Sequence, residues 1–207
     1  MAVLNFENIN KCPFLGMGEW EIPAISGIKS IEMPEKWVSF SECRKEKEPA
    51  NCGVHFFIDD YRFQAVWTHP DRYIDLLRRF KIVLSPDFSM YTDMPRALQL
   101  YNHYRKQWLS AYWQKCGITV IPTISWSDAE SFAWCFDGIP CGGIVAVSSV
   151  GTQKRKAAKE AFASGYERMN QELTPETVLY HGIVHDTSCK NIVQIGTVFT
   201  DRFRKGD

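Results

Sequence analysis

Three aspartates stand directly behind the first two predicted strands of this sequence. Asp59 and Asp60 follow one apolar run, and Asp87 follows the next. If these strands are neighbours in a parallel sheet, the three carboxylates lie on the same edge. Such carboxylates can hold Mg²⁺ or Mn²⁺ or act as general acid and base, so they are our candidate catalytic residues and metal ligands. The structural alternative is helix capping and salt bridges to nearby arginines, namely Arg62, Arg72 or Arg96.

A second candidate segment, SSVGTQKRK at 148–156, joins a predicted strand to a basic helix. Unpaired N–H groups and the positive dipole end of a helix favour an anion there, and a glycine lets the backbone come close. Cations in the first turn are unfavourable for the helix itself, which suggests that they serve a ligand such as phosphate. The candidate phosphate-binding residues are Ser148, Ser149, Gly151, Thr152, Lys154 and Arg155. The alternative is a solvated basic helix, since neither a Walker A nor a GxGxxG pattern is present.

Other polar residues follow predicted strands or face them from a long helix. We expect these to complete the rim of the site: Ser85, Thr123, Ser125 and His181 at strand ends, with Asn102 and Arg105 on the helix. Turns favour Asp and Ser regardless of function, and a helix that covers a sheet needs an apolar stripe in any case. Packing and turn chemistry therefore remain open as explanations. The sequence contains no GxSxG and no HExxH motif.

The elements that position these residues alternate between strand and helix from about Val54 to about Thr197. Strands are predicted at 53–58, 81–84, 118–121, 143–147, 177–180 and 192–195. Helices are predicted at 69–80, 93–115, 127–136 and 154–173. Short β-branched strands without alternation suit a sheet that is buried on both faces, and helical crossovers permit parallel pairing. The sequence therefore predicts an α/β fold with a mostly parallel five- to six-stranded sheet, either an open sheet or an incomplete βα barrel.

The chain of 207 residues is expected to form one domain. Residues 1–52 are predicted to be an irregular N-terminal arm packed on the core, with 42–51 as an exposed loop or short helix. Residues 53–207 form the predicted core, which ends in a polar tail.

The composition limits the classes of partner. Lys+Arg and Asp+Glu both number 24, so a strong non-specific DNA binder is not indicated, although a nucleic-acid enzyme is not excluded. The seven cysteines show no CxxC spacing and are read as reduced thiols. The N-terminus has no signal-peptide pattern and no apolar run is long enough to span a bilayer. We therefore expect a cytoplasmic protein without a membrane partner.

Six short sequence motifs allow this chain to be compared with a known family. The motifs are WVSF at 37–40, GVHFFIDDYRF at 53–63, LSPDFSMYTDMP at 84–95, VIPTISW at 120–126, FDGIP at 136–140 and AVSSVGT at 146–152. Together they resemble a family known as domain of unknown function 4417, which is found in phages, plasmids and bacteria. The resemblance spans Trp37 to Gly182 and implies a phage or mobile-element context in the host cytoplasm. It carries over no catalytic residue.

These observations lead to a ranked set of hypotheses. The first is a phage or mobile-element protein that binds a phosphate-bearing ligand, a nucleotide or nucleic acid, at the carboxyl rim of its sheet, with metal-assisted hydrolysis as an extension. The rival is a non-enzymatic inhibitor or regulator that binds a host defence or replication protein. A third is a glycosidase or nucleosidase that uses the same carboxylates.

Overall fold

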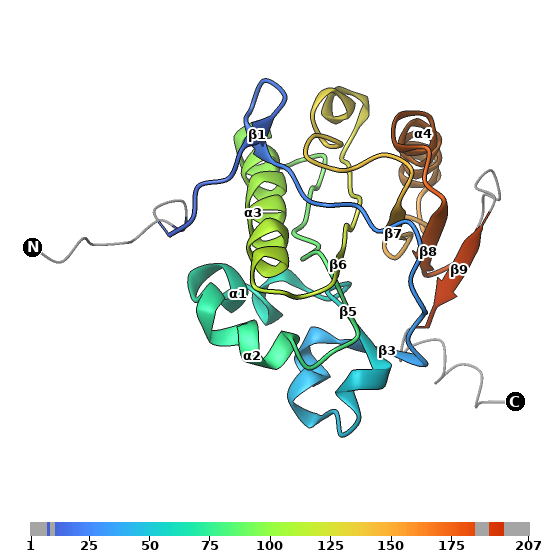
Figure 1. The fold of residues 1–207 in the computed structure, drawn as a ribbon. Coiled ribbons are helices and arrows are strands. Elements are labelled where there is room, and N and C mark those ends of the chain that lie inside the picture. The colour runs from blue at the N-terminus through green and yellow to red at the C-terminus, as the bar shows by residue number, and fades with distance from the viewer. Residues whose placement is uncertain (1–7, 9–10, 185–190, 197–207) are drawn as a thin grey trace, which may run out of the picture.

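The structure is a computed structural model that describes Asn8, residues 11–184 and residues 191–196. Figure 1 shows strands surrounded by helices on their outer side. The larger sheet has four parallel strands in sequence order, β3 (Lys36–Ser39), β4 (Cys52–His55), β5 (Ile82–Leu84) and β6 (Val120–Ile121). The second sheet has three, also parallel and in order: β7 (Ile144–Ser148), β8 (Thr177–His181) and β9 (Ile192–Ile195). The predicted α/β class with mostly parallel strands is confirmed.

A single parallel bridge between Thr123 and Ala146 joins the two sheets just beyond β6. Ile124 N–H donates to Ala146 O at 2.8 Å, and Ala146 N–H donates to Pro122 O at 2.8 Å. The strands therefore follow one another around a common interior. Within the described residues, β9 is not paired with β3, so the barrel is not closed.

The interior and the two outer layers are separate apolar clusters. The interior cluster draws on both sheets, with Ile82, Leu84, Ile121, Ile144, Ala146, Leu179 and Ile195. Outside the first sheet, Val54, Val83 and Val120 pack with aromatic residues such as Trp108 and Trp113. Outside the second sheet, Val145, Val147, Val178 and Tyr180 pack with Phe162 and Tyr166. The strands β4 to β8 are thus buried on both faces along most of their length, as their apolar sequences require.

Two long helices cover the outer faces. α3 (Arg96–Lys115) follows β5 and ends before Gly117, whose φ of 79° provides the left-handed residue that terminates the helix. α4 (Lys156–Leu173) follows β7. In Figure 1, α3 is green and lies against β5 and β6, and α4 lies beside β7 and β8.

The other connections are shorter than the sequence suggested. The helix predicted at 69–80 is divided into the 3-10 turn η5 (Pro70–Tyr73) and α2 (Ile74–Leu77), preceded by η4 (Asp60–Arg62) and α1 (Ala65–Thr68). The helix predicted at 127–136 is the 3-10 turn η6 (Ala129–Ala133). Short turns keep the loops after β4 and β6 close to the ends of their strands.

The N-terminal arm contributes more regular structure than the sequence indicated. β1 (Gly16–Met17) and β2 (Ile22–Pro23) form an antiparallel hairpin beside α3. The arm then passes the start of β7, where Ile144 N–H donates to Ile28 O, and adds β3 to the first sheet. The segment at 42–51 contains η2 (Phe40–Lys45) and η3 (Pro49–Asn51). The arm supplies a strand because Trp37 closes over Gly53 of β4, where any side chain would collide with the indole.

Candidate functional site

Five polar side chains gather between the carboxyl ends of β4, β5 and β6 and the inner face of α3. We refer to Asp60, Asp87, Arg105, Lys106 and Ser125 as the charged cluster. Asp60 begins η4, Asp87 follows β5 and Ser125 follows β6, whereas Arg105 and Lys106 come from the middle of α3. The predicted rim residues Asp60, Asp87, Arg105 and Ser125 are therefore brought to the same end of the sheet.

Lys106 is the deepest member of the charged cluster. Its side chain is only 1% exposed, and its Nζ donates a hydrogen bond of 2.9 Å to Ser125 Oγ. Ser125 also interacts with the Asp87 carboxylate, whose pKa it lowers. The serine hydroxyl thus lies between a buried ammonium and a carboxylate, and Ser125 and Asp87 both remain partly exposed.

Asp60 and Arg105 form the outer part of the charged cluster. The Asp60 carboxylate accepts from Ser89 N–H at 3.1 Å and from Ser89 Oγ at 2.8 Å. It lies 3.9 Å from Nη2 of Arg105. Arg105 also donates to Gln64 Oε1 at 2.8 Å, and its guanidinium stacks 3.6 Å from the centre of the Phe88 ring. These contacts fix the loop after β5 against α3, which sets the position of Asp87.

Burial shifts the charged groups toward their neutral forms. Desolvation raises the pKa of Asp87 to about 6, partly offset by the Coulombic attraction of Lys106. Desolvation lowers the pKa of Lys106 to about 8, opposed by the nearby Asp87 carboxylate. Burial likewise lowers the pKa of Arg105, which Asp60 opposes. Perturbed groups of opposite charge at the carboxyl ends of parallel strands are typical of functional sites.

Asp59 lies apart from the other two aspartates. Its side chain is 71% exposed, and its carboxylate lies 3.6 Å from Nε of Arg62, as the salt-bridge alternative anticipated. Across the described residues, no three His, Cys, Asp or Glu side chains are grouped so that they could hold a metal ion. Asp60 and Asp87 are the two candidate ligands that share a site, and a divalent cation there would need ligand or water oxygens as well.

The predicted phosphate-binding segment lies on the adjacent strand end, after β7. Its hydroxyl groups make internal bonds: Ser148 with His181 Nδ1 at 3.0 Å, Ser149 to Ile183 O at 2.9 Å and Thr152 to Ser149 O at 2.8 Å. Gly151 has a φ of 87°, and Lys154 and Arg155 are exposed. α4 has no side-chain N-cap and no acidic residue in its first turn. The polar groups at the N-terminus of α4 are thus backbone N–H groups and cationic side chains, which suit an anion.

His181 belongs to a second buried group on the inner side of the strands. We refer to His55 of β4 and His181 of β8 as the imidazole pair; their ring centres lie 5.2 Å apart, and Phe57 stacks on both. Nδ1 of His55 accepts from Phe57 N–H at 3.3 Å, and Nε2 of His181 is buried with no hydrogen-bond partner among the described residues. Desolvation lowers the pKa of His55 to about 4 and that of His181 to about 3. Both imidazoles are therefore neutral.

Three predicted rim residues support the scaffold. Ser85 is completely buried, and its Oγ accepts from Ser110 of α3 at 2.7 Å. Thr123 Oγ1 donates to Ser85 O at 2.9 Å. Asn102 Nδ2 donates to Ser89 O at 2.6 Å and so holds the residue that binds Asp60. The hydroxyl groups of Ser85 and Thr123 and the amide of Asn102 therefore hold in place the loops that carry the charged cluster.

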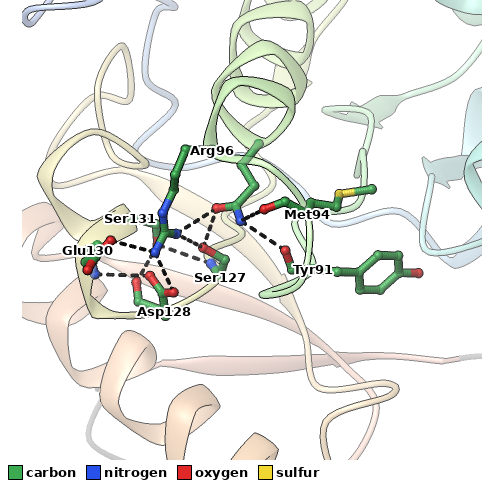
Figure 2. A network of polar contacts seen from close by, with 8 residues as sticks. Tyr91, Met94, Arg96, Ser127, Asp128, Glu130 and Ser131 are labelled. Carbon is green, nitrogen blue, oxygen red and sulfur yellow. Dashed lines mark hydrogen bonds and ion pairs between the residues drawn. The ribbon is translucent and has the colours of Figure 1, made fainter.

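A surface network secures the segment that follows Ser125. Figure 2 shows Arg96 at the start of α3 reaching Asp128 at 2.7 Å and Glu130 at 2.8 Å. It also donates to Ser127 Oγ at 3.2 Å. The arginine predicted as a salt-bridge partner therefore ties η6 to α3, but its partners are Asp128 and Glu130.

Sequence reasoning missed Lys106, Ser89 and His55 as members of these groups. Lys106 lies on the same face of α3 as Asn102 and Ser110, which are all buried. Polar residues at helical spacing within the stripe that covers a sheet were the available signal. His55 lies in a strand, and which of its neighbours it meets across the interior depends on the curvature of the sheets.

Comparisons with known proteins identify the family. The family model described as Domain of unknown function (DUF4417) matches residues 15–199. The chain belongs to this family. It is 40% identical over 154 residues to the Gene 1 protein of Mycobacterium phage L5, covering 73% of this chain and 67% of that protein.

A second relative extends the match along nearly the whole chain. The Gene 1 protein of Mycobacterium phage D29 is 34% identical over 205 residues, covering 97% of this chain and 75% of that protein. No solved structure matches the chain. No helix in the described part of the DUF4417 chain is long and apolar enough to cross a membrane.

Proposed function

We propose that this DUF4417 protein binds a phosphate-bearing ligand, a nucleotide or nucleic acid, at the carboxyl rim of its strands and hydrolyses it there. The observation that carries the proposal is the buried Lys106–Ser125–Asp87 arrangement at the rim. Burying an ammonium and a carboxylate costs several kcal/mol per ion unless the groups are well paired. Within the described residues, neither makes a direct ion pair, so a purely stabilising role explains the arrangement poorly.

The ligand would extend across the ends of β5, β6 and β7. The Thr123–Ala146 bridge brings the loops that contain Ser125 and Ser148 side by side, because each serine lies two residues beyond a bridged residue. One phosphate would rest on the backbone N–H groups at the start of α4, with Lys154 and Arg155 beside it. The reacting phosphate would then reach the charged cluster.

Asp87 is the proton-transfer group of this proposal. A general base is most effective when its pKa lies near the working pH, and burial brings the Asp87 pKa to about 6. Lys106 and Arg105 offset the negative charge of a phosphate, which would otherwise be repelled by Asp60 and Asp87. Mg²⁺ or Mn²⁺ on these two carboxylates is the metal-assisted form, and dependence of hydrolysis on added Mg²⁺ after EDTA treatment tests it.

The test measures both the binding and the hydrolysis of two ligands, ATP and a short single-stranded oligonucleotide. Isothermal titration calorimetry measures the binding. Lys154→Ala with Arg155→Ala should weaken binding on the order of tenfold, a loss of about 1.4 kcal/mol. Lys159→Ala is the matched control, because this exposed lysine lies one turn further along α4. Equal affinities in all three proteins, or no binding by the wild type, would contradict the proposal. Asp87→Asn should remove hydrolysis while Asp59→Asn leaves it intact.

One observation favours the rival function, binding of a host defence or replication protein. The β1–β2 hairpin exposes Leu15 (87%), Met17 (51%) and Trp20 (48%). Exposed apolar side chains grouped on one hairpin are typical of protein contacts. If this is the function, Leu15→Ser with Trp20→Ser should abolish binding to the host protein while phosphate-ligand binding is unchanged.

A further inference from the structure

The Ser125 hydroxyl differs from the other serines of the rim in the groups that surround it. Ser148 is bonded to a neutral imidazole, and Ser85 is bonded to another serine, Ser110. Ser125 Oγ instead accepts from Lys106 Nζ at 2.9 Å and interacts with the Asp87 carboxylate. The Ser125 oxygen therefore lies beside the Lys106 ammonium, and the hydroxyl has a proton acceptor nearby in the Asp87 carboxylate.

We propose that Ser125 is a nucleophile that attacks the phosphorus of a phosphate ester, with Asp87 as its base and Lys106 as the group that stabilises its oxygen. This inference rests on the proposed function and names the step by which the same site would act. A weakly acidic hydroxyl becomes a nucleophile when a base within hydrogen-bond reach takes its proton. The geometry supplies both the base and a cation at the position where negative charge develops.

The other contact of Ser125 leaves its proton available. Within the described residues, Ser125 Oγ also lies 3.8 Å from Met90 Sδ, a weak acceptor. Loss of this contact costs little, because a thioether sulfur is a weak acceptor. Catalytic hydrogen bonds are often loose without substrate and tighten when it binds.

Access to the hydroxyl comes from the rim. Ser125 and Asp87 are partly exposed, whereas Lys106 lies beneath them and is 1% exposed. A phosphate group approaching from solvent therefore meets the hydroxyl and the carboxylate first. The ammonium lies on the far side of Oγ, where it stays protected from water and keeps its electrostatic strength.

The reaction balances with these groups and water. Ser125 Oγ forms a bond to phosphorus as its proton moves to Asp87, and the bond from phosphorus to the alcohol leaving group breaks. The protonated Asp87 then gives that proton to the departing alkoxide. Water then attacks the phosphoserine as Asp87 takes its proton, and the bond from phosphorus to Oγ breaks. Asp87 returns that proton to Oγ, so Ser125 is regenerated as inorganic phosphate or a phosphomonoester leaves.

A fluorophosphonate probe tests the nucleophile directly, because it transfers its phosphorus to an activated serine with loss of fluoride. The expected result is one modified peptide, containing Ser125, in the native full-length chain. Ser125→Ala should lose the label, and Ser110→Ala, which removes a buried hydroxyl from α3, should keep it. Circular dichroism of both variants establishes that they are folded.

If Ser125→Ala does not fold, Ser125→Cys preserves the size of the side chain. The nearby ammonium favours the thiolate, so the new thiol should react with iodoacetamide faster than Cys141, which is exposed. A rate equal to or slower than that of Cys141 would overturn the proposed activation.

The dependence of labelling on Asp87 separates catalysis from structure. Asp87→Asn should slow labelling by more than tenfold, because it removes the carboxylate that takes the Ser125 proton. Asp59→Asn, which changes the exposed neighbouring aspartate, should label at the wild-type rate. Equal labelling rates for Asp87→Asn and the wild type would overturn the role of Asp87 as the base.

The outcomes for this inference and for the proposed function are distinguishable. If ATP or the oligonucleotide binds the wild type but the probe leaves Ser125 unmodified, the nucleophile is wrong and the binding site stands. If the probe modifies Ser125 but no phosphate-bearing ligand binds, the proposed function fails and Ser125 acts on another electrophile. Equal labelling of wild type and Ser125→Ala would overturn the inference outright.

Discussion

The charged cluster and the imidazole pair are both groups of largely buried polar side chains at the carboxyl ends of strands. They differ in how the cost of desolvation is balanced. Each has a member that is hydrogen-bonded to a serine, Lys106 to Ser125 and His181 to Ser148. In the charged cluster, opposite charges oppose the effect of desolvation, and the pKa of Asp87 remains near 6. For the imidazole pair, no cause resolved within the described residues opposes desolvation, and His55 further lowers the pKa of His181.

The difference explains why one serine is our candidate nucleophile and the other is not. A histidine with a pKa of about 3 is too weak a base to take the proton of a hydroxyl at neutral pH. Asp87, by contrast, titrates close to physiological pH. Both serines make a hydrogen bond, so a hydrogen bond alone does not identify the reactive serine. The pKa of the neighbouring base distinguishes the two.

The largest expected effect comes from the imidazole pair under acid. Because the folded pKa values lie below that of a free histidine, unfolding takes up protons, and stability falls as the pH drops from about 6.5 toward 4. The free energy of unfolding should fall by about 3 kcal/mol from His55 alone. Urea denaturation of wild type and His55→Phe across this window should show a shallower loss in the variant. His69→Gln, which changes an exposed histidine, should match the wild type.

Asp87 should produce a slope of the opposite sign. Its folded pKa is raised, so its contribution to stability is complete below about pH 3.8 and is lost as the pH rises through about 6. Between pH 4 and 7, the unfolding free energy of the wild type should therefore fall relative to that of Asp87→Asn by up to about 3 kcal/mol. A constant difference between the two proteins over this range would show that the surroundings of Asp87 do not disfavour its charged form. Asp59→Asn is the exposed control.

Asp60→Asn tests whether the outer part of the charged cluster is held by charge. The variant loses charge-assisted bonds to Ser89 and leaves Arg105 without its carboxylate. The unfolding free energy should fall by about 2 kcal/mol. Thermal or urea denaturation measures the loss, and a change equal to that of Asp59→Asn would contradict the assigned role.

The smallest effect is expected at the surface network of Figure 2. Arg96→Ala removes the contacts to Asp128 and Glu130, but the side chains involved are largely solvated. Exposed pairs contribute about 0.2–1 kcal/mol, so the unfolding free energy should change by less than about 1 kcal/mol. A loss as large as that of Asp60→Asn would mean that the position of Ser125 depends on this network.

The sequence was sufficient to predict the parallel α/β fold and the end of the sheet at which polar residues gather. Short apolar runs and the turns behind them locate the ends of β5 to β8 to within one residue, because burial on both faces is a local property of each strand. β4 ends at His55, before the predicted end of that strand at residue 58. The same reasoning reached Asp60, Asp87, Arg105 and Ser125. It did not separate Asp59 from Asp60, since adjacent residues point in different directions once η4 begins.

Two features depended on information that lies far apart in the chain. The burial of Lys106 follows from how α3 is rotated on β5 and β6, which helical periodicity alone does not determine. The pairing of β3 with β4 depends on the fit of Trp37 over Gly53. Both are long-range contacts, and a pattern of residue types along one segment does not report them.

A crystal structure with orthovanadate would identify the reactive serine, because vanadate mimics the transition state of phosphoryl transfer and bonds to an activated serine. If Ser125 is the nucleophile, vanadium is bonded to Ser125 Oγ, with Lys106 and Asp87 in contact with the vanadate oxygens. Vanadate beside Ser148 and the imidazole pair, or an unoccupied charged cluster at saturating vanadate, would contradict this assignment.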